Sequence, residues 1–146
     1  ESPLKFDDII SPICLPSADQ QIDDDLKVVA TGFGFGGPNS TRDNYRLRET
    51  SMPVHEEKWR NALQLRGVIC AGSSDHKVQH GDSGGPLAMK ATDGRWFQIG
   101  ITSFGLNGHW VAPKTFTDVR KYCGWIKETT RGDVSCQEEV AVETIQ

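Results

Sequence analysis

Apolar and polar residues alternate over several short stretches of the chain, which is the pattern of half-buried β-strands. In the clearest stretch Phe97, Ile99 and Ile101 are each followed by a polar or small residue, so one face of this strand is expected to be buried. Residues 87–89 are its expected hairpin partner. The Asp-Gly pair at residues 93–94 lies between the two and suits a tight turn with positive φ angles.

Three earlier strands are expected near residues 28–32, 47–54 and 68–70. Helical spacing of apolar residues occurs between residues 55 and 65 and again after Asp118, a suitable N-terminal cap. Short strands separated by turn signals predict an all-β sandwich or barrel, with a short helix in the middle and a C-terminal helix.

The composition fits one globular domain or a piece of a larger one. The chain has 146 residues, of which 36% are apolar and 25% charged, with 15 Gly and 7 Pro. Its net charge of -4 argues against nucleic acid or an anionic membrane surface as a partner. The chain lacks an initiator Met, a signal-peptide core and an apolar run long enough to span a bilayer, so we expect that it starts inside a longer protein.

The cysteines indicate an oxidising compartment. They are four in number, widely spaced and without a Cys-x-x-Cys pair, so disulfides are favoured over zinc: Cys14, Cys70, Cys123 and Cys136. Asn39 begins a glycosylation sequon, which is a candidate site and agrees with secretion. No metal site is expected, because no two histidines show ligand spacing beside a carboxylate.

The candidate nucleophile lies in the hexapeptide Gly-Asp-Ser-Gly-Gly-Pro at residues 81–86. Glycines allow the backbone to turn sharply and expose Ser83, while the amides of Gly81 and Ser83 can bind the oxyanion of a tetrahedral intermediate. An ordinary glycine-rich turn with a solvated serine is the alternative. The same residues also fit the nucleophile elbow of α/β-hydrolases, but no buried strand precedes them and no helix follows, which argues against that fold.

The hexapeptide resembles that of the chymotrypsin-like (trypsin-like) serine proteases, and the resemblance covers about residues 3–128. Further similar motifs are Pro-Ile-Cys-Leu-Pro at 12–16, Gly-Phe-Gly at 32–34, Met-Pro-Val at 52–54, Ile-Cys-Ala-Gly at 69–72 and Ser-Phe-Gly at 103–105. The resemblance implies the second six-stranded antiparallel Greek-key barrel of a two-barrel protease. Residues 1–130 are then the C-terminal half of the protease domain, with part of the linker between barrels, and residues 131–146 are a polar, acidic extension.

A serine needs a histidine as general base and an acid that orients it. The resemblance places both partners upstream of residue 1, so this chain is expected to be inactive alone. An internal substitute base is disfavoured, because none of the four histidines has the family's sequence setting: His55, His76, His80 and His109. In the family, the residue matching Asp82 pairs with the amino terminus created by zymogen activation and thereby shapes the oxyanion hole. Without that cation we expect a zymogen-like pocket.

The substrate site is also implied by resemblance. Ser103, Phe104 and Gly105 match the backbone segment that pairs with the substrate as an added strand. Lys77 and Lys114 match two positions of the primary pocket, and two ammonium groups there would favour Asp or Glu before the scissile bond.

Two other specificities stay open. A shift of the alignment by two residues would place Asp75 at the base of the primary pocket and favour basic substrates instead. Alternatively, Lys77 and Lys114 could fill the pocket and close it to a side chain.

By resemblance Cys14 bridges to the missing N-terminal half, while Cys70 lacks its usual partner. Cys123 and Cys136 depart from the family pattern and could join the C-terminal extension to the preceding helix.

The sequence therefore predicts part of a secreted serine endopeptidase that needs no cofactor. Its expected partners are a protein or peptide substrate, the missing N-terminal barrel and a protease inhibitor. The alternative is an inactive protease homologue that serves as a binding or regulatory module.

Overall fold

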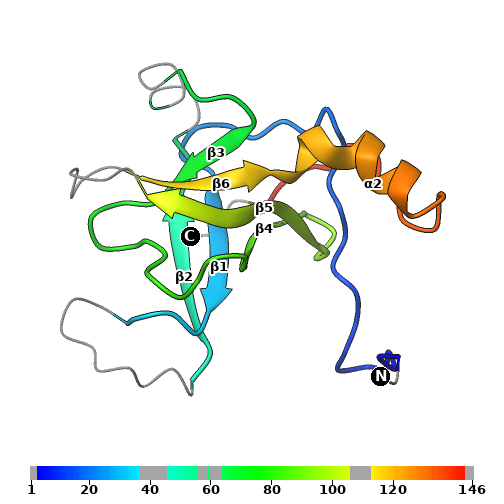
Figure 1. The fold of residues 1–146 in the computed structure, drawn as a ribbon, viewed down its shortest axis with the longest axis horizontal. Helices are drawn as coiled ribbons and strands as arrows, with labels where there is room; N and C mark the ends of the chain where they lie inside the picture. Colours follow the sequence, from blue (N-terminus) through cyan, green and yellow to red (C-terminus); the bar gives the residue numbers. More distant parts are fainter. Residues whose placement is uncertain (1–2, 37–45, 56–58, 60–63, 106–112, 144–146) are drawn as a thin grey trace.

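A computed structural model describes residues 3–36, 46–55, 59, 64–105 and 113–143 of the chain (Figure 1). These residues form strands followed by two consecutive short helices: β1 (Lys27–Gly32), β2 (Arg48–Pro53), β3 (Val68–Ala71), β4 (Pro86–Lys90), β5 (Trp96–Gly105), β6 (Lys114–Asp118), the 3-10 helix η1 (Val119–Tyr122) and α2 (Cys123–Thr129).

The six strands form one antiparallel sheet in the order β2-β1-β4-β5-β6-β3. Its two edge strands meet where a bridge joins Val54 to Ala71 and the Gly72 amide donates to the Pro53 carbonyl at 2.9 Å. The sheet is therefore curled on itself. Strands β1, β2 and β3 follow one another around it and β4 returns beside β1, which is the Greek-key order. The predicted all-β, trypsin-like barrel is confirmed.

The barrel interior consists of apolar side chains contributed by alternating strand positions. Val28 and Ala30 of β1, Met89 of β4 and Phe97 of β5 are all buried. Burying each of the larger side chains contributes roughly 1.5–3 kcal/mol, so the alternating positions account for much of the fold's stability.

The alternation in β5 changes face at a bulge opposite Leu87 and Ala88. Ile99, the extra residue of the bulge, is fully buried, whereas Ile101 beyond it is 36% exposed, so the expectation that Ile101 lies on the buried face is wrong. A Cβ on Gly100 would lie 3.1 Å from the Leu87 Cβ, and this close approach requires glycine.

The turn between β4 and β5 differs in detail from the expectation of positive φ angles at the Asp-Gly pair. The Gly94 amide donates to the Ala91 carbonyl at 2.9 Å, so Thr92 and Asp93 are the central residues of the turn. Among the turn residues Gly94 alone has a positive φ, of 89°. This is the arrangement of hairpins in which a glycine follows the turn.

The C-terminal helix begins where it was expected. The Asp118 side chain accepts a hydrogen bond from the Arg120 amide and caps η1, which continues into α2. The helix expected at residues 55–65 lies largely outside the described residues.

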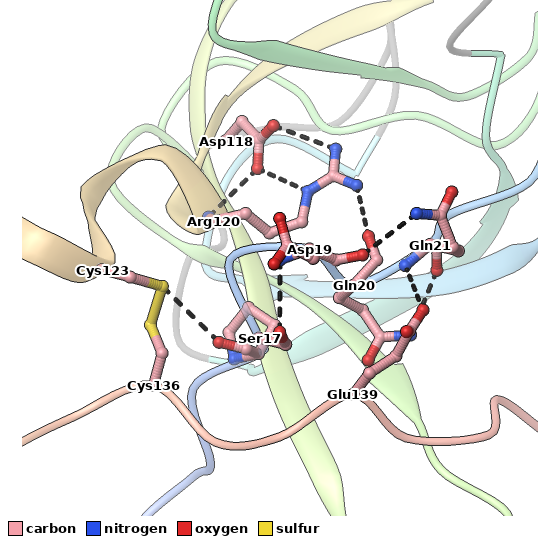
Figure 2. A network of polar contacts seen from close by, with 10 residues as sticks. Ser17, Asp19, Gln20, Gln21, Asp118, Arg120, Cys123, Cys136 and Glu139 are labelled. Carbon is pink, nitrogen blue, oxygen red and sulfur yellow. Dashed lines mark hydrogen bonds and ion pairs between the residues drawn. A yellow bond between two sulfur atoms is a disulfide. The ribbon is translucent and has the colours of Figure 1, made fainter.

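An extended segment follows the helix and crosses the linker that precedes β1. A disulfide joins Cys123 to Cys136 (Figure 2). Val140 then exchanges two hydrogen bonds with the buried Gln20 side chain, of 2.9 and 3.0 Å, and Val142 forms a bridge with Ala91. Val140 and Val142 both pack against the core. The segment after α2 therefore holds the linker against the barrel.

Candidate active site

Ser83 lies in a turn that leads into β4. The Gly85 amide donates to the Asp82 carbonyl at 2.9 Å, and Gly84 has a φ of 83°, a conformation that favours glycine. The Gly84 amide donates to the Thr102 carbonyl at 2.9 Å, and the Thr102 amide donates to the Gly85 carbonyl at 2.8 Å. Ser83 is exposed. Its hydroxyl is therefore presented to solvent by a turn that is fixed to β5.

Two backbone amides beside the Ser83 hydroxyl are not used by the fold. In the part of the chain that the structure describes, neither the Gly81 amide nor the Ser83 amide donates to a protein acceptor. Gly81 has a φ of 98°, and a Cβ there would lie 3.1 Å from the Gly34 Cα. Available amide donors next to an exposed serine are the arrangement that oxyanion binding needs.

The Asp82 carboxylate is half-buried and is held by backbone amides. Its Oδ1 accepts from the Gly34 amide and its Oδ2 from the Gln79 amide, each at 2.8 Å. A Cβ on Gly32 would overlap Oδ1, and a Cβ on Gly34 would lie 2.5 Å from the carboxylate carbon. The glycines at 32 and 34 therefore form a cradle that the Asp82 side chain fills.

A cavity of about 830 Å³ lies beside this carboxylate. Its charged lining consists of Asp82, Arg48, Glu49, Asp75 and Lys77. Among the described side chains, no ion pair within 4.0 Å involves Asp82. The cavity therefore holds a carboxylate with an uncompensated charge and has room for another cation.

The residues proposed for the primary substrate pocket lie in two places. Lys77 and Asp75 line the cavity of Asp82, as described above. Lys114 instead begins β6 opposite Gly105, and a Cβ on Gly105 would lie 2.6 Å from the Lys114 ammonium. The ammonium of Lys114 thus lies over the backbone that resembles the substrate-binding strand.

The segment that resembles the substrate-binding strand is the C-terminal end of β5. Ser103 and Phe104 are exposed there, with 47% of Phe104 accessible, and a bulge separates Thr102 from Phe104 in the pairing with β6. The Phe104 carbonyl accepts from the Thr115 hydroxyl at 2.5 Å, which fixes the backbone.

The three histidines in the described residues form hydrogen bonds or ring contacts with residues other than Ser83. The ring of His80 stacks on Phe35, with centroids 6.1 Å apart, and the His55 amide donates to the Cys70 carbonyl at 2.7 Å. His76 is exposed and its amide donates to the Ser73 hydroxyl at 3.2 Å. None of these three histidines bonds to Ser83. His109 and the sequon at Asn39 lie outside the described residues.

The cysteines differ in their surroundings. Cys123 and Cys136 form the disulfide described above. Cys14 is half-buried in the linker, where it forms a bridge with Phe97, and Cys70 is fully buried in β3.

Three residues around Asp82 are not evident from the sequence as parts of its site. Gly32 and Gly34 are visible there only as a family motif, and no motif marks Arg48. The hydrogen bond between the Gly34 amide and Asp82 links positions 48 residues apart, so no local pattern could reveal it.

The described ranges contain neither a metal-ligand cluster nor a membrane-spanning helix. No cluster of three or more His, Cys, Asp or Glu side chains there is placed to hold a metal ion. No helix there has the length and apolar character that crossing a membrane requires.

Comparisons with known proteins agree on one family. Residues 1–126 match the family model described as Trypsin. The chain is 33% identical over 151 residues to the CLIP domain-containing serine protease B14 of Anopheles gambiae, an alignment that covers 88% of this chain and 40% of the relative.

Two further relatives have similar identities. The transmembrane protease serine 11G of Rattus norvegicus is 33% identical over 138 residues, covering 88% of this chain and 33% of that protein. The serine proteinase stubble of Drosophila melanogaster is 32% identical over 143 residues, covering 90% of this chain and 18% of that protein. The chain thus spans less than half the length of these relatives.

Proposed function

The chain belongs to the trypsin family of serine proteases, and from this membership we propose that it is the second-barrel part of an endopeptidase with Ser83 as nucleophile. The observation that carries the proposal is the exposed Ser83 beside the amides of Gly81 and Ser83, which have no acceptor among the described residues. This geometry suits acyl transfer, in which negative charge develops on the carbonyl oxygen next to the attacking group.

The reaction proceeds in two halves. The Ser83 oxygen attacks the peptide carbonyl carbon while a histidine of the upstream half takes the hydroxyl proton. The amides of Gly81 and Ser83 donate to the resulting oxyanion. The histidine then protonates the leaving amine, the C–N bond breaks, and an acyl-serine forms. Water, deprotonated by the same histidine, attacks this ester and releases the acid and the Ser83 hydroxyl.

The upstream half supplies the histidine and the aspartate that orients it. An apolar segment at the start of the chain supports this partner, since Leu4 is 75%, Phe6 61% and Ile9 91% exposed. Figure 1 shows this blue segment running away from the barrel. Exposed apolar side chains in sequence favour a covering partner, and we assign that place to the N-terminal barrel.

The cavity beside Asp82 supports an activation step. An amino terminus generated by proteolysis would enter the cavity and pair with the carboxylate, which the amides of Gly34 and Gln79 already hold. Because Asp82 directly precedes Ser83 and follows Gly81, this pairing would fix the oxyanion amides.

Substrate preference follows from the charge over the substrate-binding strand. The Lys114 ammonium at Gly105 favours an acidic side chain before the scissile bond. Lys77 is part of the Asp82 cavity, so we assign the preference to Lys114 alone. Protein or peptide substrates and an extracellular location complete the proposal, and the Cys123–Cys136 disulfide supports secretion.

A fluorophosphonate probe tests the nucleophile in the protein that carries both halves. We expect the probe to label Ser83, and Ser83→Ala to abolish labelling and to lower peptide hydrolysis by several orders of magnitude. Ser51→Ala is the matched control, because Ser51 is exposed on β2 and should leave both rates unchanged. Labelling of another residue would contradict the assignment, and a folded wild type without labelling would indicate an inactive homologue.

A further inference from the structure

Arg48, the first residue of β2, lies across the backbone of the segment that follows β1. Its Nη1 donates to the Gly34 carbonyl at 3.4 Å. A Cβ on Gly36 would overlap the same nitrogen, although Gly36 does not have the positive φ that requires glycine. An alanine at residue 36 would therefore displace the guanidinium without straining the backbone.

Gly34 and Phe35, which lie beneath the guanidinium, form hydrogen bonds with the two residues that flank Gly81 in sequence. The Gly34 amide donates to Asp82 Oδ1 at 2.8 Å, and the Phe35 amide donates to the His80 carbonyl at 3.0 Å. The Phe35 ring also stacks on the His80 ring at an interplanar angle of 19°. Gly81 thus lies between two residues that are both tied to this segment.

One peptide group connects Arg48 to these contacts. The Gly34 carbonyl that accepts from Arg48 and the Phe35 amide that donates to His80 belong to the same peptide unit. A cation at the carbonyl end polarises the peptide and strengthens its N–H as a donor. Arg48 also lines the cavity of Asp82, where its charge is opposite to that of the carboxylate.

We propose that Arg48 is a positioning residue for the oxyanion site. Seated over residues 34–36, it holds that segment against His80 and Asp82 and so fixes the direction of the Gly81 amide. The inference rests on the proposed function, because that direction matters to catalysis only if Ser83 is the nucleophile.

Two variants of the intact protein test the seated position of the guanidinium. Arg48→Gln removes the cation, and Gly36→Ala displaces it without removing its charge or straining the backbone. We expect each to lower kcat for peptide hydrolysis about tenfold while KM changes less than twofold, because an oxyanion donor acts on the transition state.

The control variants make the same two kinds of substitution at other positions. Arg46 is exposed like Arg48 but does not line the cavity, and a Cβ on Gly124 meets nothing within 4 Å. Arg46→Gln and Gly124→Ala should therefore keep the wild-type kcat. Wild-type kcat in both Arg48→Gln and Gly36→Ala would overturn the proposal. So would a loss in Arg48→Gln alone, because a displaced guanidinium would then serve as well as a seated one.

Hydrogen exchange provides a readout that does not depend on activity. We expect the Gly34 and Phe35 amides to exchange about tenfold faster in Arg48→Gln and Gly36→Ala, with the urea midpoint of unfolding unchanged. Exchange at the wild-type rate would overturn the proposal. If fluorophosphonate does not label the wild type, the protease function fails, whereas amide exchange still decides whether Arg48 holds the segment.

Discussion

Two aspartates of this barrel are partly or fully buried, and their carboxylates have different partners. Asp118 is only 2% exposed and has a cationic partner two residues further along the chain. Asp82 is half-buried, and among the described residues it has only backbone amides as partners.

The Asp118 pair is complete within this chain. Its Oδ1 accepts from the Arg120 Nε and its Oδ2 from the Arg120 Nη2, both at 2.9 Å. A further nitrogen of the guanidinium donates to the Gln20 carbonyl at 2.7 Å, so the pair also holds the linker (Figure 2). Two parallel bonds of this kind satisfy both charges where water is excluded.

Asp82 has the opposite arrangement, since its carboxylate faces a cavity whose lining includes Arg48 and Lys77 at distances beyond an ion pair. An unpaired carboxylate in such a place is costly unless a cation can reach it. The comparison teaches that the buried Asp118 has a cationic partner inside the fold, whereas Asp82, the neighbour of Ser83, has only backbone amides as partners among the described residues.

The largest expected effect is from breaking the complete pair. Asp118→Asn removes the carboxylate that accepts two charged hydrogen bonds from the largely buried Arg120 guanidinium, so we expect the free energy of unfolding to fall by about 3 kcal/mol. Urea-induced unfolding measures this loss. An unchanged midpoint would show that the Asp118 carboxylate is not needed to stabilise the Arg120 guanidinium.

An exposed pair of the same spacing is the control. Asp93 and Arg95 bond at 2.7 Å, but 49% and 46% of their side chains are accessible. The side-chain hydrogen bond from Arg95 lowers the pKa of Asp93, so any contribution to stability is present at neutral pH and is lost as the pH falls through that lowered pKa. Asp93→Asn should leave the urea midpoint nearly unchanged.

An effect of similar size is expected from the disulfide that joins α2 to the segment after it. Cys123 and Cys136 are 13 positions apart, and a loop of that size stabilises by about 3 kcal/mol through the unfolded state. The double replacement by serine should lower the free energy of unfolding by about this amount and speed amide exchange at Val140. Reductant should destabilise the wild type and leave the double variant unaffected. A wild type whose stability does not change with reductant would contradict the prediction.

The strands were predictable where burial follows a period of two. Val28 and Ala30, or Phe97 and Ile99, are buried at alternate positions, and the sequence shows this directly. Strand β6 was missed because Thr115 and Phe116 are adjacent and both fully buried, which breaks the alternation.

The contacts of the C-terminal segment could not be predicted from its composition. Residues 131–146 are polar and acidic, yet Val140 and Val142 pack against the core because Gln20 and Ala91 pair with their backbone. These partners are distant in sequence, so only the folded structure brings them together.

The candidate site likewise contains residues that the sequence reveals and residues that only the fold brings together. The hexapeptide at residues 81–86 is local and could be found by its residues alone. The cradle of Asp82 and the position of Arg48 depend on β1 and β2 meeting the loop before Ser83, a consequence of sheet topology. Glycine is uninformative until the group that fills its space is known.

The smallest effect is expected at Asp82 and sharpens the comparison. Asp82→Asn keeps one oxygen that can accept from Gly34 or Gln79, but its amide group faces the other donor, so one hydrogen bond is lost. Removal of a partly desolvated charge offsets part of this loss. We expect the free energy of unfolding to fall by about 1 kcal/mol, roughly a third of the loss in Asp118→Asn.

Asp75→Asn is the control for Asp82→Asn, because Asp75 is exposed on the same cavity and should leave the urea midpoint unchanged. If Asp82→Asn instead lost as much stability as Asp118→Asn, Asp82 would already have a cation within the folded chain. Arg48 and Lys77 would then be the groups to test, since both line its cavity. A small loss in Asp82→Asn would mean that the carboxylate contributes little to the fold before a cation arrives, as an activation site requires.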